Sequence, residues 1–393
     1  MAGLGETVAD LARYRRWAAG GLRPDAPGAR SATLVETKSF GANPGDLRML
    51  SYAPDGLAPG APLVVVLHGC TQSAQAYAEG AGWIELADRH GLVLLCPEQK
   101  AANNANRCFN WFQPEDTARG AGEAASIRQM ILQISADHAV DPARVFVTGL
   151  SAGGAMTVVM LAAYPDVFAG GAVMAGLPYG AANSVQEAFG AMFQGRSRSP
   201  RAWGDLVRQA SPHQGRWPKI AIWHGDADST VRPGAAEEIA KQWTDVWGLD
   251  AKPDSATQSR GIRRSVWKTA DGVAAIQLNI LAGMGHGAPI AAGGPDGCGR
   301  AGPYLLESGI SSSVEVLRFW GLEAEAQLRA ELEVQPRAQT APRPAQPQPR
   351  PAAAAKPHAQ PHKAAHLSLG PEKLVSGMEQ VITKALTAAG LMK

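Results

Sequence analysis

A pentapeptide at residues 149–153, Gly-Leu-Ser-Ala-Gly, carries residue types that can do chemistry. A β-branched and aromatic run precedes it at 145–148, and an alanine- and methionine-rich segment typical of a buried helix follows. In this setting of strand, turn and helix, G-x-S-x-G holds a serine on a strained turn, and the flanking glycines let strand and helix approach closely. The hydroxyl is then exposed at the carboxyl end of a sheet, where a helix amino terminus faces the anion formed after attack. Ser151 is therefore the predicted nucleophile; the alternative is a chance match in a chain with 44 glycines.

A serine nucleophile needs a base, and nine histidines are available. His286 lies in a glycine-rich loop directly after the last predicted strand, which is where a doubly wound hydrolase carries its base. His68 and His224 each precede a glycine at the end of an apolar run, where an imidazole commonly satisfies local backbone groups. We therefore predict that His286 is the base; the alternative is a structural loop histidine.

The acid that orients the base should follow the preceding strand, and two carboxylates compete there. The loop reads His-Gly-Asp-Ala-Asp at 224–228. Many hydrolases of this architecture use the aspartate four residues beyond such a histidine, which here is Asp228. Asp226 instead suits a role in capping the turn or the next helix. We favour Asp228 and keep Asp226 as the alternative.

A tetrahedral intermediate also needs two N–H donors for its oxyanion. We assign one to the backbone of Ala152, directly after the nucleophile, and the other to Cys70, in the loop after an earlier strand. Two matches to G-x-G-x-x-A, at 120–125 and 283–288, lack the strand and helix context of a dinucleotide site. The sequence also has no P-loop, no H-E-x-x-H and no zinc-like cysteine spacing, so we expect neither a cofactor nor a metal.

These residues need a sheet to position them, and the apolar runs supply one. Strands alternate with helices along the chain, which predicts an α/β fold with a doubly wound, mainly parallel sheet. A hairpin at 32–38 and 47–52 should form one edge. We expect helices at 77–90, at 122–138 and directly after the elbow, which is our name for the strand–turn–helix segment around Gly-Leu-Ser-Ala-Gly at 149–153. The predicted buried strands are 62–67, 92–95, 145–148, 169–175, 219–224 and, as the last, 274–281.

The composition divides the chain into four expected segments. Residues 1–32 form an amphipathic helical segment, and 33–322 form the catalytic domain. Within that domain the periodicity fades at about 185–217, which we interpret as a cap-like insertion over the active face. Residues 323–370 are a charged helix and a Pro/Ala-rich linker that we expect to be disordered, and 371–393 are a C-terminal amphipathic helix.

Charge and hydropathy exclude several classes of function. The formal net charge of +2 gives no electrostatic case for nucleic acid. No apolar run reaches the roughly 20 residues that span a bilayer. The amino terminus lacks the apolar core of a signal peptide, so we expect a cytoplasmic protein.

Cys70 and Cys108 each lie where active-site loops gather. A disulfide between them would pin the oxyanion loop; the alternative is two free thiols.

Taken together, these motifs resemble the poly(3-hydroxybutyrate) depolymerase-type esterases of the α/β-hydrolase superfamily over about residues 33–322. The resemblance implies the α/β-hydrolase fold and supports Ser151, Asp228 and His286 as a catalytic triad. Its matched stretches also suggest His68, Trp111 and Tyr179 as substrate-pocket residues. These stretches are 68–72 (His-Gly-Cys-Thr-Gln), 107–112 (Arg-Cys-Phe-Asn-Trp-Phe), 147–156 around the elbow, 175–179 (Ala-Gly-Leu-Pro-Tyr), 223–228 (Trp-His-Gly-Asp-Ala-Asp) and 309–313 (Gly-Ile-Ser-Ser-Ser).

The resemblance implies a serine carboxylesterase that acts on polyester or on short 3-hydroxyalkanoate esters. The same family holds feruloyl and acetyl esterases for plant polysaccharide, which are the alternative within this class. Many of its members are secreted, so an extracellular location is the family-based alternative to the cytoplasm. A granule- or surface-binding protein on a hydrolase scaffold is the alternative outside this class, but a binding protein has no need of an ordered triad. The C-terminal helix is the predicted contact with a polymer surface or another protein.

Overall fold

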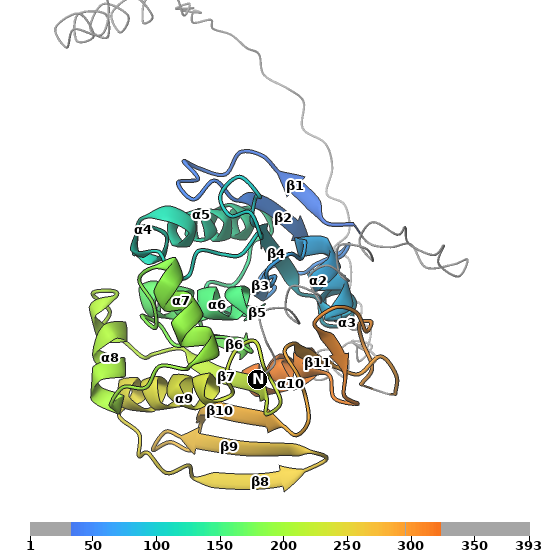
Figure 1. Ribbon diagram of the computed structural model, residues 1–393. Coiled ribbons are helices and arrows are strands. Elements are labelled where there is room, and N and C mark those ends of the chain that lie inside the picture. Colours follow the sequence, from blue (N-terminus) through green and yellow to red (C-terminus); the bar gives the residue numbers. More distant parts are fainter. Residues whose placement is uncertain (1–32, 295, 324–393) are drawn as a thin grey trace, which may run out of the picture. The chain divides into compact units, whose positions relative to one another are not determined.

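A ten-stranded sheet runs through the structure, with helices on both of its faces (Figure 1). This computed structural model describes residues 33–294 and 296–323. In order across the sheet, the strands are β1 (Val35–Thr37), β2 (Arg48–Tyr52), β4 (Val93–Glu98), β3 (Leu63–Leu67), β5 (Val145–Leu150), β6 (Gly170–Met174), β7 (Lys219–Gly225), β10 (Ala274–Leu281), β9 (Ile262–Lys268) and β8 (Ser255–Ser259).

The six central strands, from β4 to β10, are parallel, and antiparallel strands extend the sheet at both edges. The chain passes from β3 to β4 on one side and then returns to place β5 on the other side of β3. The strand order therefore reverses between β3 and β5. In open α/β sheets ligands bind at the carboxyl ends of the strands beside such a reversal, and β5 ends there at the elbow.

The two faces of the sheet have separate apolar cores because successive side chains of a strand point to opposite faces. On β3, Val65 belongs to one core and Val64 to the other. The first core includes residues of α5 (Gly122–Asp137), α6 (Ala152–Ala163), α8 (Pro200–Gln209) and α9 (Gly234–Trp247). The second includes residues of α2 (Ala74–Gly80), α3 (Trp83–His90) and α10 (Ser312–Trp320).

Most of the predicted elements are present, and the predicted α/β class with a doubly wound, mainly parallel sheet is confirmed. Helix α6 is buried along its whole length, as its alanine- and methionine-rich sequence predicts. The single helix expected at 77–90 is instead two helices, α2 and α3. They separate at Gly82, whose backbone is left-handed with φ of 79°. Glycine adopts the left-handed conformation at little cost, and a residue in that conformation interrupts an α-helix.

The sequence analysis did not predict the β8–β9 hairpin. The strand predicted at 274–281 is present as β10, but it is not the last strand of the chain. All five residues of β8 are exposed, so the segment has no apolar alternation to reveal it. After β10 come β11 (Ala288–Ile290) and β12 (Leu305–Glu307), which form a separate two-stranded parallel sheet. Their three residues each are too few to produce a clear pattern.

The predicted insertion at 185–217 contains two helices, α7 (Val185–Phe193) and α8. Both have serine caps: Ser184 accepts a hydrogen bond at the start of α7, and Ser199 does so at the start of α8. Helix α8 lies against α9, where the Gln242 side chain donates to the Trp203 carbonyl at 3.1 Å. Between the loops of the sheet lies one further short helix, α4 (Pro114–Thr117).

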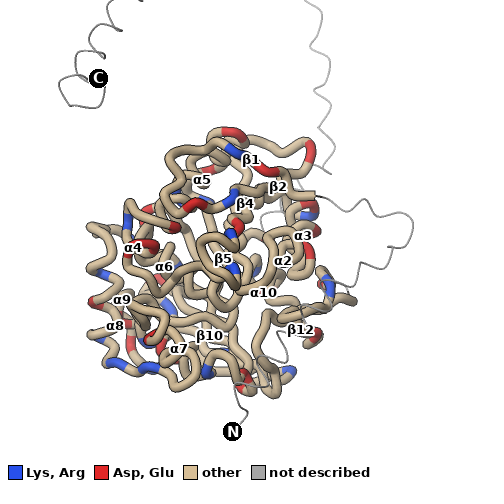
Figure 2. The backbone as a smooth tube through the Cα atoms, turned by 45° about the horizontal axis from the view of Figure 1, so that its top comes forward, with Lys and Arg blue, Asp and Glu red and all other residues tan. Residues whose placement is uncertain are grey.

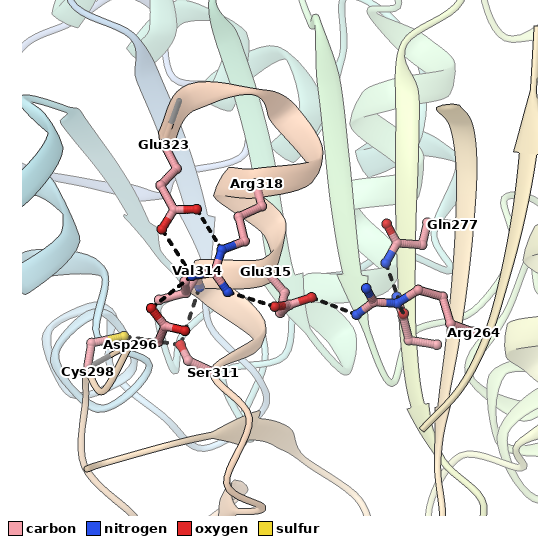
Figure 3. Close-up of polar contacts among 10 residues, drawn as sticks. Arg264, Gln277, Asp296, Cys298, Ser311, Val314, Glu315, Arg318 and Glu323 are labelled. Atoms are coloured by element: carbon pink, nitrogen blue, oxygen red, sulfur yellow. Dashed lines mark hydrogen bonds and ion pairs between the residues drawn. The ribbon is translucent and has the colours of Figure 1, made fainter. Parts of the chain in front are cut away.

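An ion pair between Arg264 of β9 and Glu315 of α10 joins these two elements, and Arg318 extends the network along α10 (Figure 3). Glu315 accepts from Arg264 at 2.6 Å and, through its other oxygen, from Arg318 at 2.9 Å. Arg318 also donates at 2.6 Å to Glu323, the last described residue. Elsewhere, acidic and basic residues are interspersed along the described chain (Figure 2). None of the helices in the described ranges has the length and apolar character needed to cross a membrane.

The described residues fall within one of two units into which the chain divides, 1–335. The segment expected to be helical at 1–32 and the C-terminal helix at 371–393 lie outside the described residues. The same is true of the linker segment at 323–370, except for Glu323. The proposed four-segment organisation stays a prediction.

Candidate active site

Ser151 sits on the turn between β5 and α6 with φ of 57° and ψ of −115°, a conformation that costs backbone energy for a residue other than glycine. Its amide donates to the Met174 carbonyl of the neighbouring strand at 2.8 Å. A Cβ on Gly149 would collide with the Gly153 carbonyl, and one on Gly153 with the Leu67 carbonyl. Both elbow glycines are therefore required by close backbone approach.

Asp228 and His286 lie together at the carboxyl end of the sheet. Asp228 is in the loop after β7 and His286 in the loop after β10, and these two strands are parallel neighbours with Gly225 opposite Leu281. The Nδ1 atom of His286 is 2.7 Å from Oδ2 of Asp228. Because a carboxylate only accepts, Nδ1 carries the proton, which leaves Nε2 free to act as a base.

Two backbone amides fix the other oxygen of Asp228. Oδ1 accepts from the amides of Thr230 at 2.8 Å and Val231 at 2.9 Å. Burial by itself would raise the pKa of Asp228, but hydrogen bonds from His224 and His286 outweigh burial and hold that pKa well below its usual range. The carboxylate is therefore ionised wherever the enzyme is folded near neutral pH.

The competing carboxylate has a different position. Asp226 is exposed, and its Oδ1 accepts from the Gly283 amide at 2.6 Å. Its own amide donates to the Leu281 carbonyl at 3.0 Å. Asp226 thus ties the loop after β10 to the loop after β7, while Asp228 contacts the imidazole.

Ser151 and His286 line one cavity of about 290 Å³. Cys70 and Ala152, whose amides are the predicted oxyanion donors, line it as well. On either side of Cys70 the amides already have partners: Gly69 donates to the Gln72 side chain at 2.8 Å, and Thr71 to the Asn106 carbonyl at 2.7 Å. This arrangement is consistent with the Cys70 amide serving an oxyanion.

A disulfide joins Cys70 to Cys108, as one of the two alternatives from the sequence predicts. Both cysteines line the cavity. The side chain of Asn104 accepts from the amides of Asn106 at 3.0 Å and Cys108 at 3.4 Å, so the loop after β4 is internally braced. The bridge therefore ties the loop after β3 to the loop after β4 at the cavity lining.

One wall of the cavity is apolar and continues onto the surface. Val185 and Phe189 of α7 line the cavity, yet they are 56% and 55% exposed. The rings of Phe189 and Phe193 lie parallel with centroids 6.0 Å apart. The sequence did not reveal this wall, although the i, i+4, i+8 spacing of 185, 189 and 193 is a helical apolar stripe. Further large apolar side chains of the lining are Trp111, Phe112, Leu150, Leu177 and Met192.

Of the three pocket residues suggested by the sequence, only Trp111 is among those that line the cavity. His68 is fully buried elsewhere: Nδ1 is 2.7 Å from the Gly69 carbonyl and Nε2 accepts from the Gln99 amide at 3.1 Å. Burial lowers the pKa of His68. Tyr179 bonds through its backbone to the Gln242 side chain, at 3.0 Å in both directions. The sequence predicts His68 and Tyr179 as pocket residues, whereas neither is among the residues that line this cavity.

A buried acid lies beneath the loop that carries Trp111. Glu123 is 1% exposed and accepts from the Gln99 side chain and from the Asn110 amide, the latter at 2.9 Å. Burial, with a smaller contribution from Asp116, raises the pKa of Glu123 to about 8.

Within the described part of the chain, no group of three or more His, Cys, Asp and Glu side chains has an arrangement that could hold a metal ion.

Comparison with known proteins agrees with this geometry. The family described as esterase PHB depolymerase matches residues 48–266. The chain is 47% identical to the poly(3-hydroxyalkanoate) depolymerase C of Paucimonas lemoignei, covering 74% of this chain and 70% of that protein. It is 35% identical to feruloyl esterase B of Thermothelomyces thermophilus, covering 65% of this chain and 88% of that protein.

A solved structure shares the fold. The acetyl xylan esterase from Aspergillus awamori matches with a TM-score of 0.62 at 24% identity, covering 74% of this chain and 99% of the esterase. Since the family match spans more than half of this chain and the first relative is close over most of its own length, the resemblance seen in the sequence is confirmed. The chain belongs to the PHB depolymerase family of esterases and is a carboxylic ester hydrolase with the α/β-hydrolase fold.

Proposed function

We propose that the chain hydrolyses its esters through an acyl-enzyme on Ser151. The Ser151 hydroxyl oxygen attacks the ester carbonyl carbon while Nε2 of His286 takes the hydroxyl proton. The carbonyl oxygen becomes an oxyanion, which the amides of Cys70 and Ala152 stabilise. Collapse of this intermediate breaks the bond to the alcohol, and the alcohol leaves with the proton from His286.

The second half repeats these steps with water. Nε2 of His286 takes a proton from water as the water oxygen attacks the acyl carbon, and it returns that proton to the Ser151 oxygen as the acid leaves. Asp228 stays ionised throughout, holds the imidazole with its proton on Nδ1, and stabilises the imidazolium that forms at each attack. The pair of Asp228 and His286, in the loops beside the elbow, carries this proposal.

We further propose that the substrate is a polyester or short ester of 3-hydroxyalkanoic acids. The 47% identity to a poly(3-hydroxyalkanoate) depolymerase supports this substrate class. The apolar wall supports it independently, because an aliphatic polyester repeats short hydrocarbon units between its ester groups. A chain longer than the cavity can continue over the exposed side chains of Val185 and Phe189.

An alternative substrate is a feruloyl ester of plant polysaccharide. The feruloyl esterase relative supports this alternative, and so do Trp111 and Phe112 in the cavity wall, because aromatic side chains pack well against a phenolic ring. An acetyl ester would leave most of the apolar wall without contact. We therefore favour the aliphatic polyester.

A substrate panel tests this proposal. Purified enzyme is assayed on 3-hydroxybutyrate oligomers, amorphous poly(3-hydroxybutyrate), methyl ferulate and acetylated xylan. We expect kcat/KM to be highest for the oligomers, with release of soluble product from the polymer. Ser151→Ala is the control and should lose about 10³-fold or more while staying folded, because it removes the nucleophile and no core volume. Highest kcat/KM on methyl ferulate would refute the substrate, and turnover by Ser151→Ala would refute the mechanism.

A further inference from the structure

A second histidine reaches the carboxylate of Asp228. His224 lies near the end of β7, and its side chain is fully buried. Its Nε2 atom is 2.9 Å from the Val231 carbonyl and 3.1 Å from Oδ2 of Asp228. The same Oδ2 atom faces Nδ1 of His286 at 2.7 Å. One carboxylate oxygen thus lies between two imidazoles, that of His224 at the end of β7 and that of His286 in the loop after the neighbouring strand β10.

The surroundings of His224 decide which of its nitrogens carries the proton. A carbonyl can only accept, so Nε2 must donate to Val231. The Nδ1 atom is buried and has no hydrogen-bond partner within residues 33–294 and 296–323. A proton on Nδ1 would be a buried N–H without an acceptor, which is unfavourable, so the arrangement places the proton on Nε2. The proton on Nε2 of His224 is therefore directed at the Val231 carbonyl, with Oδ2 of Asp228 close beside it.

We infer that His224 is a positioning residue of this esterase, acting on the reaction through Asp228; the inference rests on the triad proposed above. Its N–H group closes a small loop of contacts. His224 holds the Val231 carbonyl, the Val231 amide holds Oδ1 of Asp228, and Asp228 holds His286. Since Val231 also lines the cavity, one buried N–H positions both the acid and a part of the pocket wall.

The contact between His224 and Asp228 also changes the charge distribution of the carboxylate. The partial positive charge of the His224 N–H draws electron density toward Oδ2, so Asp228 stabilises the imidazolium of His286 less than an unshared carboxylate would. Among the described residues, the titratable groups in contact with this oxygen are the two imidazoles. The ring of Tyr304, from the loop before β12, lies against His286 with centroids 5.9 Å apart. Loss of His224 should therefore move the acidic limb of the pH profile of kcat/KM to higher pH.

The matched variants His224→Gln and His224→Asn test the inference on the full-length protein. The Gln amide nitrogen can occupy the position of Nε2, whereas the Asn amide reaches only to the position of Nδ1. With a soluble 3-hydroxybutyrate oligomer, we expect His224→Asn to lose about 10- to 100-fold in kcat with KM within about threefold of wild type. His224→Gln should keep most of the kcat and the wild-type pH midpoint. Equal kcat values for the two folded variants would overturn the inference.

A double-mutant cycle separates positioning from general damage to the fold. If His224 works through Asp228, then adding His224→Asn to Asp228→Asn should cost no more than about twofold further in kcat. Losses that multiply would overturn the inference. Thermal melting of each variant accompanies the kinetics, and a lower Tm with wild-type kcat and pH midpoint would leave His224 as scaffold and overturn it too. Failure of the triad itself is distinguishable, because Ser151→Ala would then retain turnover.

Discussion

Gly225 lies directly against the carbonyl of Met284, so closely that a Cβ on Gly225 would overlap the Met284 backbone. The Ala227 amide donates to the same carbonyl at 3.1 Å. These contacts press the loop after β7 against the loop after β10, and the two loops carry Asp228 and His286. The glycine after His224 thus sets the distance between the acid and the base.

The first prediction follows from this contact. Gly225→Ala should lower the free energy of unfolding by about 1–3 kcal/mol, because the backbone of one loop must move. It should lower kcat as well, since that movement separates Asp228 from His286. Gly234→Ala is the matched control: no atom lies near its Cβ, and the position is at the start of α9. The free energy of unfolding from denaturant melts and the kcat should both be lower for Gly225→Ala than for Gly234→Ala. Equal stability and activity of the two variants would contradict the prediction.

The second prediction separates the two loop carboxylates. Asp228→Asn should lower kcat by several orders of magnitude, because an amide facing Nδ1 favours the wrong imidazole tautomer. Asp226→Asn removes only a contact with the Gly283 amide and should cost far less. Steady-state kinetics on a soluble ester decide between them, and equal losses or the reverse order would assign the acid to Asp226.

The third prediction concerns the disulfide. Cys70 and Cys108 are 38 residues apart, and closing a loop of this length stabilises a fold by about 3–4 kcal/mol in the chain-entropy model. Replacing both cysteines with serine should lower the free energy of unfolding and reduce kcat more than it changes KM, since the loop that offers the Cys70 amide loses its tether.

Mass spectrometry of a non-reduced digest provides the direct measurement for the bridge. Peptides linked through Cys70 and Cys108 are expected in the wild-type protein. The buried, unpaired Cys96 serves as the internal control, because it should be alkylated only after unfolding. Two free thiols at 70 and 108 after exposure to an oxidising buffer would refute the bridge.

The fourth prediction uses the buried Glu123, whose pKa rises from an ordinary value of 4.5 to about 8 on folding. Between these values the folded protein keeps a proton that the unfolded chain has released. The contribution of Glu123 to the free energy of unfolding therefore falls as pH rises through this window, by up to about 1.4 kcal/mol per pH unit, and levels off above it.

Glu123→Gln should remove this dependence, because glutamine resembles the protonated acid at every pH. Urea melts of wild type and variant at several values from pH 5 to 9 provide the measurement. We expect wild type to lose stability relative to the variant as pH rises. A constant difference between the two proteins across the range would contradict the raised pKa.

The fifth prediction concerns the segment after residue 334, which lies outside the described residues. We propose that its C-terminal helix holds the enzyme on a polymer surface. A protein ending at 334 should then keep its activity on soluble short esters and lose activity on insoluble polymer, because only the solid surface must first be reached and held. Unchanged activity on both substrates would refute the anchor. Equal loss on both would mean that the segment belongs to the catalytic fold.

Local features of the chain were visible in the sequence because they depend on neighbours along it. The elbow at Ser151 needs a strand, two glycines and a helix within a dozen residues, and all are contiguous. The buried strands are continuous apolar runs because both of their faces are covered. The order of the serine, the acid and the base along the chain followed from the same pattern.

Tertiary structure decided what depends on residues far apart in the chain. Asp228 and His286 are 58 residues apart, and only the pairing of β7 with β10 puts the former, rather than Asp226, against the imidazole. The interior position of His68, just after β3, and the approach of His224 to Asp228 depend on the direction in which each side chain leaves the backbone. The polar strand β8 has no apolar pattern, because its stability comes from pairing with β9 rather than from burial. Such contacts form only when the strands assemble into the sheet, so they could not be predicted from any local run of residues.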